Sequence, residues 1–236
     1  MAAKKKSVIT RMGRRLRRPI NRWLAGRSLI GDDKIVPAEV VPGLAALQPH
    51  WQAIRDELEP LLAAREAIPS LGDISPDHKR IAPGQHWKSY FFKGYGFRSD
   101  ENLAQCPLTA ELIEQVPGLV VAFFSIMEPG THVPRHRGLT KAWLNCHLPL
   151  RVPKGPGRCE IDVGGTMCQW REGEWLVFDE TNEHEVWNES EELRAVLFLQ
   201  VRRPMTRVGR AAAGLLFQAI RHSPFVQDVK QEIGAR

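Results

Sequence analysis

The sequence predicts a mainly β protein in which helices flank an antiparallel barrel. Short runs rich in β-branched and aromatic residues follow one another closely from residue 119 to residue 205. The pair Gly164-Gly165 separates two such runs, which is a strong signal for a tight hairpin. Apolar residues recur at helical spacing before and after this region. Together these patterns favour a double-stranded β-helix, which is a jelly-roll or cupin-like barrel.

The expected strands alternate with turn residues along the chain. An early strand is expected from Trp87 to Phe92, where aromatic residues favour β structure. The last strand, "LRAVLFLQV", places Arg194 on one face with Val196, Phe198 and Gln200. Between these two, strands are expected in "LVVAFFSIM", "KAWLNCHLPLRV", both arms of "RCEIDVGGTMCQW", "EWLVFD" and "HEVW".

Helices are expected in four segments outside the barrel. Residues 1–27 form a basic amphipathic segment interrupted by Pro19, and residues 44–69 predict a helix that breaks at Pro60. Residues 107–118 predict a short helix with Thr109 as its N-cap. Residues 206–236 predict one amphipathic helix packed on the body. The chain thus divides into an N-terminal segment (1–27), a helical and β lead-in (28–118), the barrel core (119–205) and a C-terminal helix (206–236).

Charge is unevenly distributed along the chain. Residues 1–27 carry ten Lys or Arg and no acid, whereas residues 28–201 carry 16 basic groups and 25 acids. Basic ends on an acidic body indicate a polyanionic partner. We expect the first segment to lie as a helix on anionic lipid, with the C-terminal segment on the body or on the same membrane face. A disordered tail, a nucleic-acid arm and an organelle transit peptide are the alternatives, and no nucleic-acid partner is expected.

The sequence also limits the cellular setting. No apolar run approaches the roughly 20 residues that span a bilayer, and the start of the chain lacks the apolar stretch of a secretory signal. The four cysteines show no CxxC spacing, which indicates a reducing compartment. We therefore expect a cytoplasmic protein that is peripheral on the inner face of the cytoplasmic membrane.

Two histidines are the candidate metal ligands. His136 follows the turn-rich stretch "EPGTHVPR", and His184 begins an expected strand. Two histidines on barrel strands are the usual protein part of a mononuclear iron site, which one carboxylate completes. In the common version the carboxylate lies two residues after the first histidine, and here that residue is Gly138.

Arg194 is the candidate anion-binding residue. It lies on a strand among apolar neighbours, where an unpaired guanidinium is costly to bury. Its planar fork suits a carboxylate. The partner is either a bound anion or a structural salt bridge with Glu180, Glu183 or Glu185.

The other histidines have weaker signals. His147 lies on an expected strand, where a histidine is more often a core residue than a ligand. His132 is expected close to the site but not on the metal, and surface positions are expected for His50, His78, His86 and His222.

The stretch "FSIMEPGTHVPRHRG", followed by "CHLPL", "FDETNEHEVWN" and "LRAVLFLQVRRP", resembles the aspartyl/asparaginyl β-hydroxylase family of Fe(II)- and 2-oxoglutarate-dependent dioxygenases. The resemblance covers residues 85 to 205. It implies that His136 and His184 hold Fe(II) as the only protein ligands, with water in the place that a carboxylate would take at Gly138. It also implies that Ser125 and His147 contact 2-oxoglutarate.

The resemblance further implies that Arg194 pairs with the distal carboxylate of 2-oxoglutarate, and that O2 is the cosubstrate. Animal peptide hydroxylases of the family carry a basic substrate-binding residue where this chain has Asn145, and their helical repeat region is absent here. The family also contains bacterial enzymes that hydroxylate acyl chains of lipid A or ornithine-type lipids. The segment "WKSYFFKGYG" and the basic ends are similar to those enzymes.

The reaction expected from this resemblance is hydroxylation of an unactivated C–H bond on a membrane lipid acyl chain. Asp179 and Glu180 are expected next to the metal and facing the substrate, or else in a solvated turn. A peptidyl Asp/Asn or small-molecule hydroxylase is the second hypothesis, and a cupin-like binding module without turnover is the third. A zinc hydrolase built on His136, His147 and His184 is a further alternative, but no general base accompanies them.

Overall fold

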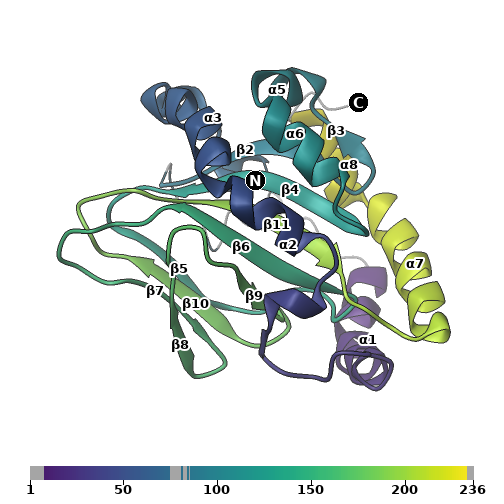
Figure 1. Ribbon diagram of the computed structural model, residues 1–236. Coiled ribbons are helices and arrows are strands. Elements are labelled where there is room, and N and C mark those ends of the chain that lie inside the picture. The colour runs from purple at the N-terminus through teal and green to yellow at the C-terminus, as the bar shows by residue number, and fades with distance from the viewer. Residues whose placement is uncertain (1–7, 75–80, 82–83, 85, 233–236) are drawn as a thin grey trace, which may run out of the picture.

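The computed structural model describes residues 8–74, 81, 84 and 86–232 (Figure 1). Two antiparallel sheets face each other, and helices cover the outside of the larger one. The expected fold class, a mainly β double-stranded β-helix with flanking helices, is confirmed.

The larger sheet, here called the major sheet, has seven strands. Its order is β1-β9-β6-β11-β4-β2-β3, so strands distant in sequence lie side by side. Their bounds are β1 Ile35–Val36, β2 Trp87–Gly94, β3 Phe97–Arg98, β4 Leu119–Met127, β6 Trp143–Arg151, β9 Leu176–Phe178 and β11 Arg194–Arg202.

The smaller sheet, here called the minor sheet, has the order β5-β10-β7-β8. Gly164 and Gly165 have φ values of 59° and 86° in the turn between β7 and β8, as the Gly-Gly signal predicts. The bounds are β5 Thr131–His136, β7 Cys159–Val163, β8 Thr166–Gln169 and β10 His184–Asn188.

Alternation along the central strands gives the major sheet two different faces. On β6, Leu144, Cys146 and Leu148 belong to the hydrophobic cluster beneath the helices. Asn145 and His147 alternate with them and therefore point to the opposite, inner face. The inner face is the one on which the candidate site lies.

The helices cover the outer face and one end of the barrel (Figure 1). Leu47, Ile54, Leu58 and Ile113 are fully buried against the major sheet. The bounds are α1 Val8–Ala25, α2 Leu44–Leu47, α3 Trp51–Ala63, α4 Leu71–Ile74, α5 Asp100–Gln105, α6 Pro107–Glu114, α7 Arg207–Arg221 and α8 Pro224–Glu232, with 3-10 turns η1 Ala38–Val40, η2 Gln48–His50 and η3 Arg65–Ala67.

Prolines were misleading as helix breakers. The break expected at Pro60 is wrong, because α3 continues through it to Ala63. The interruption falls at η2 instead, where Pro49 occupies one of the first positions of a turn. Pro60 lies in the last turn of α3, where its missing N–H costs one hydrogen bond while Leu62 stays buried. Likewise, Pro19 lies within α1 and does not end it.

The expected N-cap at Thr109 is also wrong. The helix α6 begins at Pro107, and Thr109 is fully buried inside its first turn. The carboxylate of Glu57 on α3 accepts hydrogen bonds from the amides of Leu108 and Thr109 at 2.8 Å each. A negative group from another helix thus satisfies this N-terminus.

The C-terminal segment forms two helices rather than one. Helix α7 ends at Arg221, and α8 begins at Pro224 after a short turn. Phe217 and Ile220 of α7 pack on the body together with Leu24 of α1. Residues 1–7 of the basic segment and 233–236 of the C-terminal one lie outside the described residues. No helix within the described ranges is both long and apolar enough to cross a bilayer.

Candidate active site

His136 and His184 lie opposite each other on two adjacent strands of the minor sheet. They are register partners on β5 and β10, and their ring centroids lie 4.1 Å apart. Val133 pairs with Val186, so β5 has two residues between its paired positions where β10 has one. This β-bulge lets both Val133 and His136 turn inward, which strict alternation would forbid. The bulge therefore brings His136 to His184.

Hydrogen bonds fix the tautomer of both imidazoles. Nδ1 of His136 lies 2.8 Å from the carbonyl oxygen of Pro134, and Nδ1 of His184 lies 3.0 Å from that of Asn182. Because a carbonyl only accepts, each Nδ1 carries the proton, and the lone pair is on Nε2. Burial and the neighbouring His136 lower the pKa of His184 to about 4, which keeps it neutral. Two imidazoles oriented in this way, each with its Nε2 left for a ligand, are suitable partners for a divalent metal.

Gly138 has no room for a side chain. A Cβ there would lie 2.1 Å from the carboxyl carbon of Glu180. Its amide donates to the Glu180 carbonyl at 2.6 Å, and the Leu139 amide donates to Glu180 Oε1 at 3.0 Å. Glu180, which lies in the turn after β9, fills the space that a ligand carboxylate at position 138 would need. Within the described residues no three His, Cys, Asp or Glu side chains form a metal cluster, so two imidazoles are what the chain offers.

Glu180 is buried, so its expected alternative as an acid in a solvated turn is wrong. Burial and the nearby Asp179 raise the pKa of Glu180 to about 7, although hydrogen bonds from Leu139 and Asn145 oppose the shift. The carboxyl therefore titrates near neutral pH in contact with Gly138, which lies two residues along the chain from His136.

Glu180 is expected to make the metal-free protein less stable as pH rises. A folded-state pKa above the unfolded value means that the folded state holds the proton more tightly. The loss begins near the unfolded carboxyl pKa and is complete above about pH 7, reaching about 3 kcal/mol. Urea unfolding of wild type and Glu180→Gln at acidic and mildly alkaline pH measures it. An equal pH dependence in both proteins would contradict the assignment.

Arg194 is buried on the inner face of β11. Its side chain is 2% exposed, and its guanidinium carbon lies 4.5 Å from the centre of the Trp170 ring. It contacts the Met127 sulfur and the Ser125 carbonyl, while its Nε finds no hydrogen-bond partner in the part of the chain that the structure describes. Burial lowers the pKa of Arg194 to about 10, so it remains a cation. Among the described residues no carboxylate forms an ion pair with it.

The expected structural alternative for Arg194 is therefore wrong. Glu185 binds Arg135 and His132, Glu183 lies 3.8 Å from Arg137, and Glu180 faces Gly138. Glu185 and Trp187 alternate with the inward His184 on β10, so His132 lies on the outer face with them. A buried cation that has no anionic partner favours the binding of an anion beside it.

His147 differs from the other two histidines in its tautomer. The Trp170 indole donates to His147 Nδ1 at 3.2 Å, so the proton of His147 is on Nε2. Burial, then Arg194 and His184, lower its pKa well below the usual value. A neutral His147 is thus a donor beside Arg194. A three-histidine zinc centre does not fit, because His147 and the pair form no metal cluster among the described residues.

Ser125 lies beside Arg194 on the neighbouring strand. Its hydroxyl accepts a hydrogen bond from the Trp87 indole at 2.9 Å and is 2% exposed. Ser125 is register-paired with Val196, one strand from Arg194. The structure therefore gathers Ser125, His147 and Arg194 on one face of the major sheet. The contacts of these three residues with 2-oxoglutarate, which the resemblance implies, stay a prediction.

A second polar group lies on the same face, further along β6 and β11. Gln200 donates to Asn145 at 3.1 Å and to Glu180 at 3.1 Å. The Gln200 Oε1 is buried and without a partner among the described residues. Asn145 and Glu180, both expected to face substrate, are thus brought together, and Gln200 joins them.

Asp179 does not share this position. It is fully buried, and its carboxylate is bound by Arg203 at 2.5 Å and Lys141 at 2.6 Å. Its other oxygen accepts from the amide and hydroxyl of Thr181. We correct the expectation that Asp179 faces substrate, because its carboxylate anchors the turn that carries Glu180.

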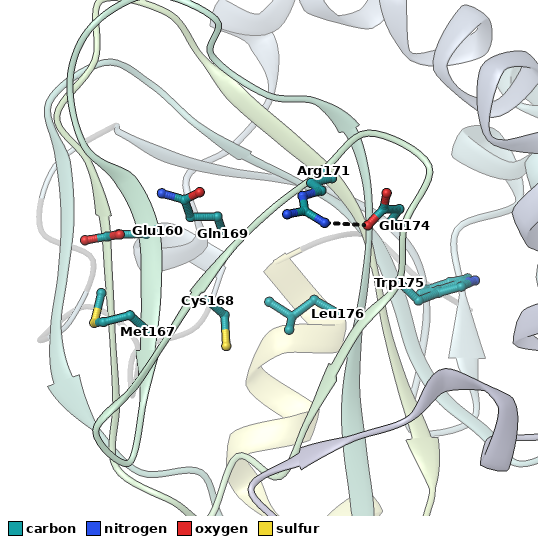
Figure 2. A pocket seen from close by; sticks show the side chains of 8 residues that line it. All are labelled: Glu160, Met167, Cys168, Gln169, Arg171, Glu174, Trp175 and Leu176. Atoms are coloured by element: carbon teal, nitrogen blue, oxygen red, sulfur yellow. Dashed lines mark ion pairs between the residues drawn. The ribbon is translucent and has the colours of Figure 1, made fainter.

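A cavity of about 440 Å³ is lined by residues of β8, of the turn that follows it and of the start of β9, together with Glu160 of β7. Figure 2 shows Cys168 and Leu176 on its two sides and the ion pair of Arg171 with Glu174. None of the site histidines lines it, although Leu176 is the register partner of His147. We place the candidate centre at the histidines, because the buried cation and the oriented imidazoles are there.

Two site residues escaped the sequence reasoning. Trp170 contacts both His147 and Arg194, and Gln200 links Asn145 to Glu180. Strand alternation placed Gln200 on the face of Arg194, but nothing in the sequence marked it as a site residue. Trp170 follows β8, and the sequence alone does not indicate whether the side chain at this position points inward or outward.

Comparisons with known proteins agree on one family. The family model described as aspartyl/asparaginyl beta-hydroxylase matches residues 48–204. The ornithine lipid ester-linked acyl 2-hydroxylase of Rhizobium tropici is 36% identical over 199 residues, covering 84% of this chain and 71% of that protein. The aspartyl/asparaginyl beta-hydroxylase of Homo sapiens is 31% identical, covering 67% of this chain and 21% of that protein.

A likeness to solved structures is also found. The prolyl-4-hydroxylase of Pseudomonas putida aligns with a TM-score of 0.42 and 18% identity, over 78% of this chain and 97% of that one.

Proposed function

The chain belongs to the aspartyl/asparaginyl β-hydroxylase family, and from this premise we propose that it is an Fe(II)- and 2-oxoglutarate-dependent dioxygenase. Its relatives named above are hydroxylases. The observation that carries the proposal is the buried Arg194, a cation with no acid to pair with among the described residues. A carboxylate of a bound keto-diacid would supply that pair.

The inner face of the major sheet suits 2-oxoglutarate. The fork of Arg194 would bind one carboxylate, with the Ser125 hydroxyl and the Nε2–H of His147 as further donors. Trp170 stacks on the guanidinium of Arg194 and donates a hydrogen bond to His147, which holds both side chains in place. These residues orient the cosubstrate and exclude water around it.

His136 and His184 would hold the iron through Nε2, since each Nδ1 donates to a backbone carbonyl. When bound, Fe(II) supplies the activation of O2 that hydroxylates a C–H bond, with 2-oxoglutarate oxidised to succinate and CO2. Glu180 keeps position 138 closed to any protein carboxylate, so coordination positions stay open for small molecules. Phe178 lies against His184 and shields that side from water.

The proposed substrate is an acyl chain of a membrane aminolipid. The R. tropici relative, which acts on the ester-linked acyl chain of an ornithine lipid, supports it over most of this chain's length. A substrate with a carboxylate would require a cationic side chain at the position of Asn145. Asn145 and Gln200 instead present neutral amides, which can donate hydrogen bonds to an ester or amide carbonyl. Lipid A is a second acyl substrate, and a peptidyl Asp/Asn residue or a small molecule is the alternative class.

Lipid turnover tests this proposal. The purified protein is given Fe(II), 2-oxoglutarate and O2 with vesicles that contain ornithine lipid, lipid A or neither, and separately with an Asp/Asn peptide. We expect 2-oxoglutarate-dependent gain of one oxygen atom on the lipid acyl chain by mass spectrometry. Hydroxylation of the peptide alone would favour the peptidyl hydroxylase. No succinate release with any of these substrates would favour a binding module without turnover.

A further inference from the structure

Helix α1 has an apolar side that nothing in the described structure covers. Leu16, Ile20 and Trp23 are 49%, 42% and 41% exposed. Their spacing of four and three residues places them on one stripe of the helix. Asn21 and Leu24, which lie to one side of this stripe, are buried against the body. One side of the helix is therefore packed on the body, and an apolar stripe is left in solvent. Leu29, which follows the helix in sequence, is also exposed, at 65%.

The charge carried by α1 and by the residues that follow it to Gly31 has one sign. Residues 1–31 contain no acid. Arg18, Arg22 and Arg27 are exposed, and the guanidinium of Arg27 lies 5.2 Å from the Trp23 ring centre. Apolar residues with an indole, flanked by cations, are the composition of helices that lie in the interface of anionic membranes. A nucleic-acid surface would use the cations but would leave Leu16 and Ile20 without an apolar environment.

Neighbouring structure extends the cationic character. The amide of Thr206 donates to the Arg27 carbonyl and that of Leu29 to Pro204, so the end of α1 is tied to the start of α7. Helix α7 carries arginines and no acid. Figure 1 shows α1 and α7 together at one end of the barrel, away from the minor-sheet hairpin of β7 and β8.

Asn21 connects α1 to the candidate site. Its side chain donates to the Leu139 carbonyl at 3.2 Å and accepts from the Lys141 amide at 3.0 Å. Leu139 in turn donates its amide to Glu180, and its own side chain is 47% exposed. The loop after His136 is thus held between α1 and Glu180. A surface that binds α1 would therefore lie close to the loop that follows His136.

We propose that Leu16, Ile20, Trp23 and Leu29, with Arg18, Arg22 and Arg27, form a docking surface for an anionic lipid bilayer, here called the α1 face. Docking would bring the loop at Leu139 to the lipid, from which an acyl chain could reach the histidines. The inference rests on the proposed lipid substrate. The cations attract the anionic headgroups, and the apolar stripe adds burial in the interface.

Vesicle sedimentation of the full chain tests the α1 face. We expect binding to phosphatidylcholine vesicles that contain phosphatidylglycerol, weak binding to pure phosphatidylcholine, and weakening by salt. Arg18→Glu with Arg22→Glu should lower partitioning by about tenfold or more. Leu16→Ser, Ile20→Ser and Trp23→Ser together should also lower it, and the remaining binding should stay salt-sensitive.

Matched controls change the same residue types elsewhere. Arg151→Glu with Arg171→Glu reverses two exposed charges on the barrel, and Val40→Ser with Met167→Ser removes exposed apolar groups. These should retain wild-type partitioning. All changed side chains are at the surface, so circular dichroism should match wild type. Arg151 and Arg171 form surface ion pairs with Glu59 and Glu174, so a small decrease in Tm is expected for that control.

Three results would overturn the docking surface: no preference of the wild type for anionic vesicles, equal losses in the control variants, or binding of duplex DNA that anionic vesicles do not compete with. Binding of 2-oxoglutarate is measured on the same proteins. A wild type that binds 2-oxoglutarate but not vesicles disproves docking alone. Vesicle binding without 2-oxoglutarate binding leaves docking in place and disproves the oxygenase.

Discussion

Arg194→Met is expected to abolish 2-oxoglutarate binding while leaving the fold at least as stable as wild type. Truncating one member of a buried charge pair costs about 2–5 kcal/mol of binding, which raises Kd by about 30-fold or more. Without the cosubstrate, however, the guanidinium of Arg194 is buried with no acid near it in the described structure. Methionine removes that desolvation cost, so Tm should hold or rise. Calorimetric titration with 2-oxoglutarate and thermal unfolding give the two readouts.

Arg158→Met is the matched control for this change. Arg158 also lies over a tryptophan, 3.5 Å from the centre of the Trp187 ring, but on the outer face of the minor sheet. It should lose no 2-oxoglutarate affinity. Arg194→Lys keeps the charge and loses the planar fork, so its Kd for 2-oxoglutarate should lie between that of wild type and that of Arg194→Met. Unchanged affinity in Arg194→Met would remove the main support for the cosubstrate assignment.

Gly138→Ala is expected to destabilise the protein by about 1–3 kcal/mol, and Gly138→Asp by more, because the added atoms would overlap the buried Glu180 and force it to move. The new Cβ would meet the Glu180 carboxyl group, which is itself held by Leu139 and Gln200. An aspartate here should therefore fail to act as a third metal ligand. Urea unfolding gives the stability, and Co(II) titration followed by absorbance gives the metal affinity.

Two further variants make this prediction specific. Gly214→Ala lies in α7 with nothing within 4 Å of its new Cβ, and it should be neutral or slightly stabilising. Glu180→Ala should relieve the clash, so the cost of Gly138→Ala should shrink in that background. An unchanged cost in the double variant would show that Glu180 is not the obstacle. Tighter Co(II) binding by Gly138→Asp would show that position 138 can accept a ligand.

The sequence was informative where periodicity determines structure. Runs of β-branched residues located the long strands, and strand alternation correctly put Arg194 and Gln200 on one face. Gly164-Gly165 gave the hairpin because only a turn with positive φ fits two residues there. These are local properties, and local properties can be read from neighbouring residues.

What the sequence could not give depends on contacts between distant segments. The N-terminus of α6 is capped by Glu57, which lies 51 residues before Leu108. Pro60 does not break α3, because burial of Leu58 and Leu62 outweighs one lost hydrogen bond. The filling of Gly138 by Glu180 and the binding of Asp179 by Arg203 likewise join residues far apart in sequence. No periodicity records such pairs.

The bulge in β5 has a consequence for how this site tolerates change. The two histidines face each other only because β5 is one residue longer than the segment of β10 that it pairs with. Side chains at Pro134 and Arg135 can vary, since their number and not their chemistry sets the direction of His136. Loss of either residue would turn the imidazole to the surface that Glu185 occupies. The position of His136 is therefore more sensitive to a change in the length of β5 than to substitutions within it.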